Sequence, residues 1–169
     1  MAVSIRITHN LPQIQRLFQS IRQFGGNPTP LLQDMAFLGE NSTRERFSSQ
    51  TGPDGQRWKP SLRAQLTGGK TLTQDGHLAG SISSYVNDKS AVWGVNRIYA
   101  AIHQFGGTIK AKGTGGLRFQ IAGRWSNKRQ VTIPGRPFLG LSDTDRQDML
   151  DLVSNYLNNL IRRSAPGGA

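Results

Sequence analysis

The sequence predicts an α+β fold whose sheet is antiparallel. Helical periodicity occurs near both ends of the chain, whereas short runs of alternating apolar and polar residues, separated by turn formers, occupy its middle. Strand and helix patterns do not alternate, so parallel βαβ units are not expected. We predict a small antiparallel sheet of hairpins packed against two N-terminal helices and a C-terminal helix, with a long glycine-rich basic loop.

Two helices are predicted before residue 50. The first covers residues 11–24, where apolar residues recur at spacings of three and four, and the glycine pair at 25–26 ends it. The second begins after Pro30 and remains one helix, although Gly39 weakens its centre. The residues expected to face the core from the second helix are Leu31, Met35, Leu38 and Phe47.

Turn formers break any periodicity between residues 51 and 80, which predicts irregular chain there. The expected tethers of this stretch to the core are Trp58, Leu62, Leu66 and Leu72. Residues 81–86 and 91–95 then alternate like the two strands of a hairpin, and residues 98–105 fit a short helix.

The C-terminal helix is predicted from its start signal. The run Ser142-Asp143-Thr144-Asp145 is similar to a capping box with aspartate in place of glutamate. Seven apolar residues follow at helical spacing: Met149, Leu152, Val153, Tyr156, Leu157, Leu160 and Ile161. We expect residues 1–163 to form a single domain and residues 164–169 a disordered tail.

Composition limits the class of protein. The 169 residues include 20 glycines and 8 prolines, which favours long loops on a modest core. There is no cysteine, which excludes a disulfide framework, a thiolate nucleophile and a zinc-thiolate site. Because no signal-peptide segment and no apolar run of about 18 residues is found, we expect a cytoplasmic product without a membrane segment.

Positive charge is concentrated in the middle of the chain. The formal net charge is +11, and residues 54–141 carry thirteen bases and three acids, with no acid between Asp88 and Asp143. This balance predicts contact with a polyanion or an acidic protein surface. Nonspecific DNA binding is therefore the alternative function, although no motif for reading base sequence accompanies the charge.

Catalytic and cofactor motifs are weak. Residues 68–71, Gly-Gly-Lys-Thr, are similar to the end of a P-loop, but Ala64 stands where that pattern needs glycine, so a plain glycine turn is favoured. The three histidines are not spaced as metal ligands, and His103 is expected to hydrogen-bond the backbone rather than act as a general base. Turn chemistry accounts for Asp54, Asp75 and Asp88. We expect no enzyme activity, no metal and no cofactor.

An ordered set of landmarks runs from residue 53 to the last helix. It comprises Pro53-Asp54-Gly55, Trp58, Pro60, Asp75-Gly76, Tyr99-Ala100, Ile-His-Gln-Phe-Gly-Gly at 102–107 and Arg-Pro-Phe-Leu-Gly-Leu-Ser at 136–142. Together they resemble the phage virion morphogenesis family, the tail-completion or head–tail joining proteins of Mu-like and P2-like tailed phages. The sequence departs from the family pattern at Gly135, where alanine is more familiar, and at Asp75, where threonine is common.

The resemblance implies a structural virion protein of the neck, without catalytic residues, that completes the tail and joins it to the DNA-filled head through ring oligomerisation. It implies a homo-oligomer, expected to be sixfold because the family acts at a sixfold tail. The expected partners are tail terminator or tube proteins and head connector proteins, and contact with genomic DNA in the neck is an open alternative. The protein is expected at the neck or tail end of the virion, assembled in the host cytoplasm.

The shared motifs carry structural roles in this interpretation. The residues concerned are Tyr99, His103, Phe105, Gly106, Arg136, Pro137 and Phe138. We expect the two phenylalanines to be core anchors and Gly106 to allow a close backbone approach. Arg136 is expected to fix the segment that enters the last helix through carboxylate or carbonyl bonds.

Residues 107–133 are predicted to form a projecting basic hairpin whose strands are residues 117–121 and 130–133. We expect it to be mobile in the free protein and ordered by an acidic neighbour or by DNA, because an isolated hairpin is marginally stable in water. An acidic protein surface is favoured, since a conduit that gripped the genome would slow its exit. The expected partner-binding residues are Lys110, Lys112, Arg118, Arg124, Lys128 and Arg129.

Overall fold

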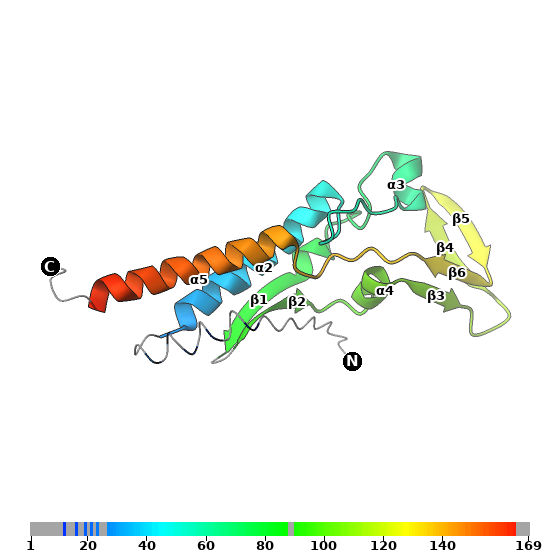
Figure 1. The fold of residues 1–169 in the computed structure, drawn as a ribbon. Coiled ribbons are helices and arrows are strands. Elements are labelled where there is room, and N and C mark those ends of the chain that lie inside the picture. Colours follow the sequence, from blue (N-terminus) through cyan, green and yellow to red (C-terminus); the bar gives the residue numbers. More distant parts are fainter. Residues whose placement is uncertain are drawn as a thin grey trace. The chain divides into compact units, whose positions relative to one another are not determined.

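The fold is α+β, as predicted, and its strands pair as three separate two-stranded sheets, β1–β2, β3–β6 and β4–β5 (Figure 1). The computed structural model describes Pro12, Arg16, Gln19, Ile21, Gln23, residues 27–87 and residues 90–164. The helices are α2 (Thr29–Ser49), α3 (Leu62–Thr67), α4 (Ala100–Phe105) and α5 (Asp143–Ser164), with a 3-10 turn at Ala79–Ser81. The strands are β1 (Ile82–Asn87), β2 (Ser90–Val95), β3 (Gly107–Lys110), β4 (Leu117–Ile121), β5 (Arg124–Lys128) and β6 (Gln130–Ile133).

The chain divides into two compact units, which we describe separately. Among the described residues, the helical unit comprises those from 12 to 42 together with 83–93 and 141–164, and the arm unit comprises 43–82 and 94–140. The division falls within α2. The single domain predicted for residues 1–163 stays a prediction, and the predicted tail lies outside the described residues except for Ser164, the last residue of α5.

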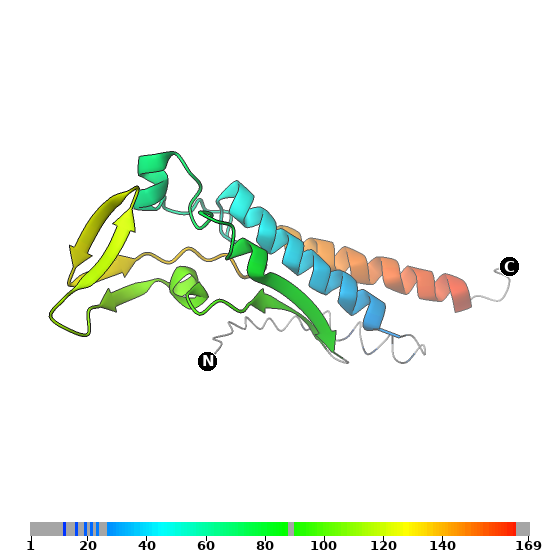
Figure 2. The ribbon, with the colours of Figure 1, turned by 180° about the vertical axis from the view of Figure 1, so that it is seen from behind.

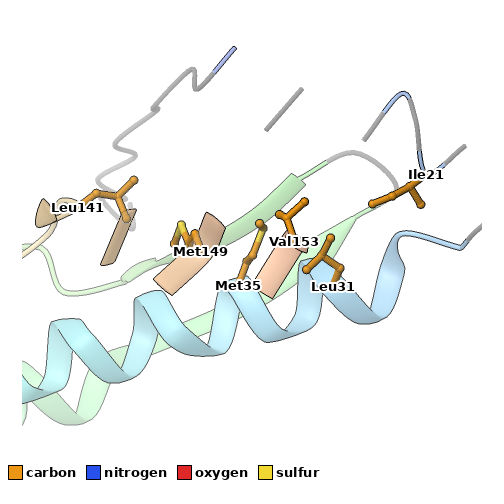
Figure 3. Close-up of a cluster of buried hydrophobic side chains, with 6 residues drawn as sticks. All are labelled: Ile21, Leu31, Met35, Leu141, Met149 and Val153. Atoms are coloured by element: carbon orange, nitrogen blue, oxygen red, sulfur yellow. The ribbon is translucent and has the colours of Figure 1, made fainter. Parts of the chain in front are cut away.

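The core of the helical unit is built from apolar residues at helical spacing. Leu31 and Met35 of α2 and Met149 and Val153 of α5 point toward one another, with Ile21 and Leu141 at the ends of the cluster (Figure 3). All six are at most 7% exposed, and burying one such side chain stabilises a fold by about 1.5–3 kcal/mol. The core faces predicted for these two helices are thereby confirmed, except at Ile161.

Two parts of the predicted helical faces need separate description, the end of α5 and the helix predicted at residues 11–24. Ile161 was predicted on the core face but is 57% exposed, because it lies in the last turn of α5, beyond the buried cluster. Of the helix predicted at residues 11–24, the five described residues are helical and Ile21 is fully buried. The other apolar residues of that face lie outside the described residues.

Local signals account for the start of α5 and the continuity of α2. The Asp145 N–H donates to Ser142 Oγ over 3.1 Å and the Ser142 N–H donates to Asp145 Oδ2 over 2.7 Å, which is the reciprocal pairing of the predicted capping box. Gly39 lies where an added Cβ would come within 2.5 Å of ring atoms of Trp93 on β2. Glycine at this position therefore permits close packing of helix on strand, and α2 runs through it unbroken.

The stretch 51–80 of the arm unit holds more structure than predicted. Ser61 Oγ caps α3 by accepting the Ala64 N–H over 3.1 Å, and Gly68 ends the helix with φ 70°, so the glycine turn is confirmed. Trp58 is buried, as predicted, and Leu72 is half-buried. Leu62 and Leu66 are 55% and 61% exposed, which corrects their prediction as tethers: this short helix buries only Ala64.

The hairpin β1–β2 and the helix α4 confirm the strands predicted at 81–86 and 91–95 and the helix predicted at 98–105. Within the described ranges, no helix combines the length and the apolar character needed to cross a lipid bilayer.

Candidate functional site

The basic arm, defined as residues 107–133, consists of two nested strand pairs, because the inner hairpin lies within the connection between the two outer strands. In the first, β3 pairs with β6 so that Gly107 lies opposite Ile133; in the second, β4 pairs with β5 so that Leu117 lies opposite Lys128. Figures 1 and 2 both show the second hairpin beside α3. The predicted pairing of residues 117–121 with 130–133 is therefore wrong.

The reason for this difference is a two-residue turn at Ala122-Gly123. Both residues have positive φ, 47° and 80°, as the tight turn that joins twisted antiparallel strands requires. Alanine rarely adopts such a φ, so the sequence carries only a weak signal for a turn at this place. The turn lets β4 fold back on β5 directly and leaves β6 free to pair with β3.

The two faces of the second hairpin differ. Leu117, Phe119 and Ile121 alternate along β4 and are half-buried. On the other face the guanidinium of Arg118 lies 5.8 Å from the ring centroid of Trp125, which is 71% exposed. This cation–π contact keeps a large aromatic surface and a positive charge together in solvent.

All six predicted partner-binding cations lie exposed on the basic arm. The arm contains no acidic residue, so its formal charge is +6 over 27 residues. Within the arm, Arg129 Nη1 donates to the carbonyl of Gly113 over 3.2 Å. The arrangement creates a positive potential suited to attracting an anionic partner, and the identity of that partner stays a prediction.

The arm is followed in the sequence by an irregular stretch, residues 136–140, which we call the anchor segment; three of its five residues are buried. Its Phe138 is fully buried and its Leu139 is 3% exposed. One side chain, Gln104 of α4, serves three of its backbone groups: Oε1 accepts the N–H groups of Phe138 and Leu139 over 2.9 and 3.0 Å, and Nε2 donates to the Leu139 carbonyl over 2.9 Å. Hydrogen bonds from a side chain thus replace the backbone hydrogen bonds that a neighbouring strand would supply.

Two further side chains complete the support of the anchor segment. Arg46 Nη1, from the part of α2 that belongs to the arm unit, donates to the carbonyls of Phe138 and Gly140 over 2.9 and 3.0 Å. Trp58 Nε1 donates to the Pro137 carbonyl over 2.9 Å. Sequence reasoning missed Arg46 and Gln104; the only available signal was a polar residue at a position that helical spacing turns inward.

The structural roles predicted for the shared motifs hold in part. Arg136 Nε donates to the Lys59 carbonyl over 2.7 Å, so the expected carbonyl bond is confirmed. Gly106 has φ 74°, and an added Cβ would lie 2.6 Å from the Gly135 nitrogen, which confirms the close backbone approach. Phe138 is a core anchor, but Phe105 is 68% exposed, because the preceding Gln104 occupies the inner face of α4.

His103 and Tyr99 lie at a cavity of the arm unit, with their ring centroids 6.0 Å apart in an edge-to-face arrangement. The expected backbone bond from the His103 ring is wrong: Nδ1 is buried and has no partner among the residues described. Burial, and secondarily the charge of Arg136, lower the pKa of His103, so the neutral imidazole is favoured. In the described ranges, no group of three or more His, Asp or Glu side chains could hold a metal ion.

Comparisons with known proteins agree with one another. The sequence profile of the phage virion morphogenesis family matches residues 9–158. The chain is 31% identical over 154 residues, 91% of its length and 96% of the relative's, to the Mu-like prophage FluMu G protein 2 of Haemophilus influenzae. It is 30% identical over 132 residues, 73% of its length and 75% of the relative's, to the putative capsid assembly protein G of Escherichia phage Mu. No solved structure matches the chain significantly.

Proposed function

The chain belongs to the phage virion morphogenesis family, and on that premise we propose that it is a non-enzymatic neck protein that completes the phage tail and joins it to the DNA-filled head. Both relatives carry names of phage or prophage G proteins, and one is named for capsid assembly, which supports a structural role in the virion. The protein acts as a ring of identical copies, sixfold to match the tail, and its partners are tail and head-connector proteins.

The observation that carries this proposal is the basic arm. Four of its six exposed cations, Lys110, Arg118, Arg124 and Lys128, lie on paired strands, and the other two lie in the connections between strands. A dense positive surface without acids favours an acidic protein surface as its partner. Trp125 and Arg118 add an exposed aromatic group with a cation beside it, and these residue types are enriched where proteins bind one another. The arm therefore docks on an acidic protein surface at the junction of tail and head.

The test is a joining assay with arms of altered charge. Replacing Lys110, Lys112, Lys128 and Arg129 by Gln removes four cations from the arm, and the count of joined particles at physiological salt should fall at least about tenfold. The control variant replaces four exposed cations outside the arm, Arg57, Lys59, Arg97 and Arg162, by Gln and changes the net charge equally.

The outcomes of this assay separate the alternatives. Loss of joining in the arm variant but not in the control supports docking through the arm. Equal losses would mean that only the net charge matters, and unimpaired joining in both would contradict the proposal. Normal joining with altered genome ejection would assign the arm to DNA instead, which a steep salt dependence of DNA binding by the purified protein would support.

A further inference from the structure

The arm unit contains a cavity of about 320 Å³ that the joining function described above does not use. Its size lies at the lower end of the range for ligand pockets, roughly 300–1,000 Å³. Its lining comes from several segments of the arm unit, and its ionisable members are Arg63, Asp75, His77, Tyr99, His103 and Arg136. A pocket of this size accepts a side chain or a small anion rather than a large cofactor.

Two of the lining side chains, the buried Arg136 and the half-buried His103, have bonding capacity that the fold does not use fully. Arg136 is 5% exposed, and its side chain donates to the carbonyls of Lys59 and Pro134 rather than to a carboxylate. His103 Nδ1 is buried and has no partner among the residues described. An unpaired buried polar atom destabilises the fold, and a ligand that hydrogen-bonds with it removes that cost.

The charges that line the pocket favour an anion. Arg63 and Arg136 are cations, and Asp75 is the single acidic residue of the lining. The planar guanidinium of Arg136 matches the geometry of a carboxylate. Because Arg136 is nearly inaccessible, only a ligand group at the end of a narrow side chain can reach it. The carboxylate of a glutamate or aspartate side chain meets this condition. A phosphodiester does not, because it is bonded on both sides into a nucleic acid backbone.

We propose that this pocket binds a carboxylate side chain of a neighbouring polypeptide, held by Arg136 and His103. A bound carboxylate raises the pKa of His103, against the effects of burial and of Arg136. The other ionisable groups that line the pocket around His103 are Arg63, Asp75, His77 and Tyr99. Binding therefore tightens as the pH falls toward 5 and weakens again when the ligand's own carboxyl takes up a proton, at about pH 4.

The experiment is an NMR titration of the histidine rings in the full-length protein. The probes are the blocked peptide Ac-Gly-Glu-Gly-NH₂, its Gln counterpart and inorganic phosphate. We expect the Glu peptide to bind with a Kd on the order of millimolar and to raise the pKa of His103, and the Gln peptide to do neither. Equal responses to the two peptides, or no response to either, would overturn the proposal, and phosphate that competes at equal affinity would assign the pocket to phosphate.

A second test changes the charge of an exposed lining residue, because substitutions of the buried residues could prevent folding. Asp75→Asn removes the exposed acid of the lining and should tighten binding of the Glu peptide about fivefold. Asp148→Asn makes the same change of net charge on an exposed position of α5 and should leave the affinity unchanged. Equal effects of the two substitutions would show that the peptide does not occupy this pocket.

Discussion

The anchor segment and the basic arm are close in sequence, and they are stabilised in opposite ways. The anchor segment has no regular secondary structure, yet most of its residues are buried and its backbone groups bond to Gln104, Arg46 and Trp58. The arm is regular, with two ladders of strand bonds, yet its strands are exposed or half-buried. The difference teaches that buried side chains and hydrogen-bonded backbone groups stabilise the arm unit, whereas the strands of the arm expose positive charge to solvent.

The first prediction compares core burial in the two regions. Phe138→Ala should destabilise the protein by about 3–5 kcal/mol, because the fully buried ring contacts Phe47 at a centroid distance of 5.4 Å. Phe119→Ala in the arm, where the ring is half-buried, should cost about 1 kcal/mol. Urea unfolding measures both, and similar losses would remove the distinction between the two regions.

The second prediction concerns the side-chain bonds. Gln104→Leu preserves volume but leaves two N–H groups and one carbonyl of the anchor segment unpaired, so the free energy of unfolding should fall by roughly 3 kcal/mol. Gln130→Leu, on exposed β6, should change it by less than about 0.5 kcal/mol. A loss under 1 kcal/mol for Gln104→Leu would show that the anchor segment does not depend on this amide.

The third prediction sharpens the description of the arm. Ala122 has φ 47°, a conformation that asparagine adopts more readily, so Ala122→Asn should stabilise the second hairpin by about 1 kcal/mol. Hydrogen exchange of the β4 and β5 amides should slow accordingly. Ala111→Asn, in the same arm but outside the turn, should not slow it; equal effects would mean that the turn is not the constraint.

The smallest effect is a pH dependence. The pKa of His103 is lowered in the folded protein, so between that pKa and the ordinary value of about 6.5 the unfolded chain binds more protons. Stability is therefore full above pH 6.5 and declines as the pH falls below it. Unfolding at pH 7.5 and pH 5 should show this decline, and His103→Gln should reduce it. An unchanged decline in His103→Gln would assign it to another group.

Sequence reasoning succeeded where a pattern has one local cause. Helical spacing placed Met35 and Val153 in a core, and the capping box at Ser142 fixed the start of α5. It failed where tertiary structure determines the local conformation. Ala122 has an unfavourable φ, which allows β4 to pair with β5. Phe105 faces solvent because the neighbouring Gln104 points inward and hydrogen-bonds the anchor segment. The cations of the arm could be read from the sequence, but the pocket around His103 could not, because its lining comes from five stretches of chain.

The central claim, that the basic arm contacts a partner protein in the virion, is tested most directly by photo-cross-linking. A photoreactive phenylalanine replaces Trp125, the exposed aromatic residue of the arm, and a control places it at Asn155 on the exposed surface of α5. Irradiation of assembled particles should link position 125 to a tail or head-connector protein with a yield well above that of position 155. Equal yields from both positions, or adducts of position 125 with DNA alone, would contradict the claim.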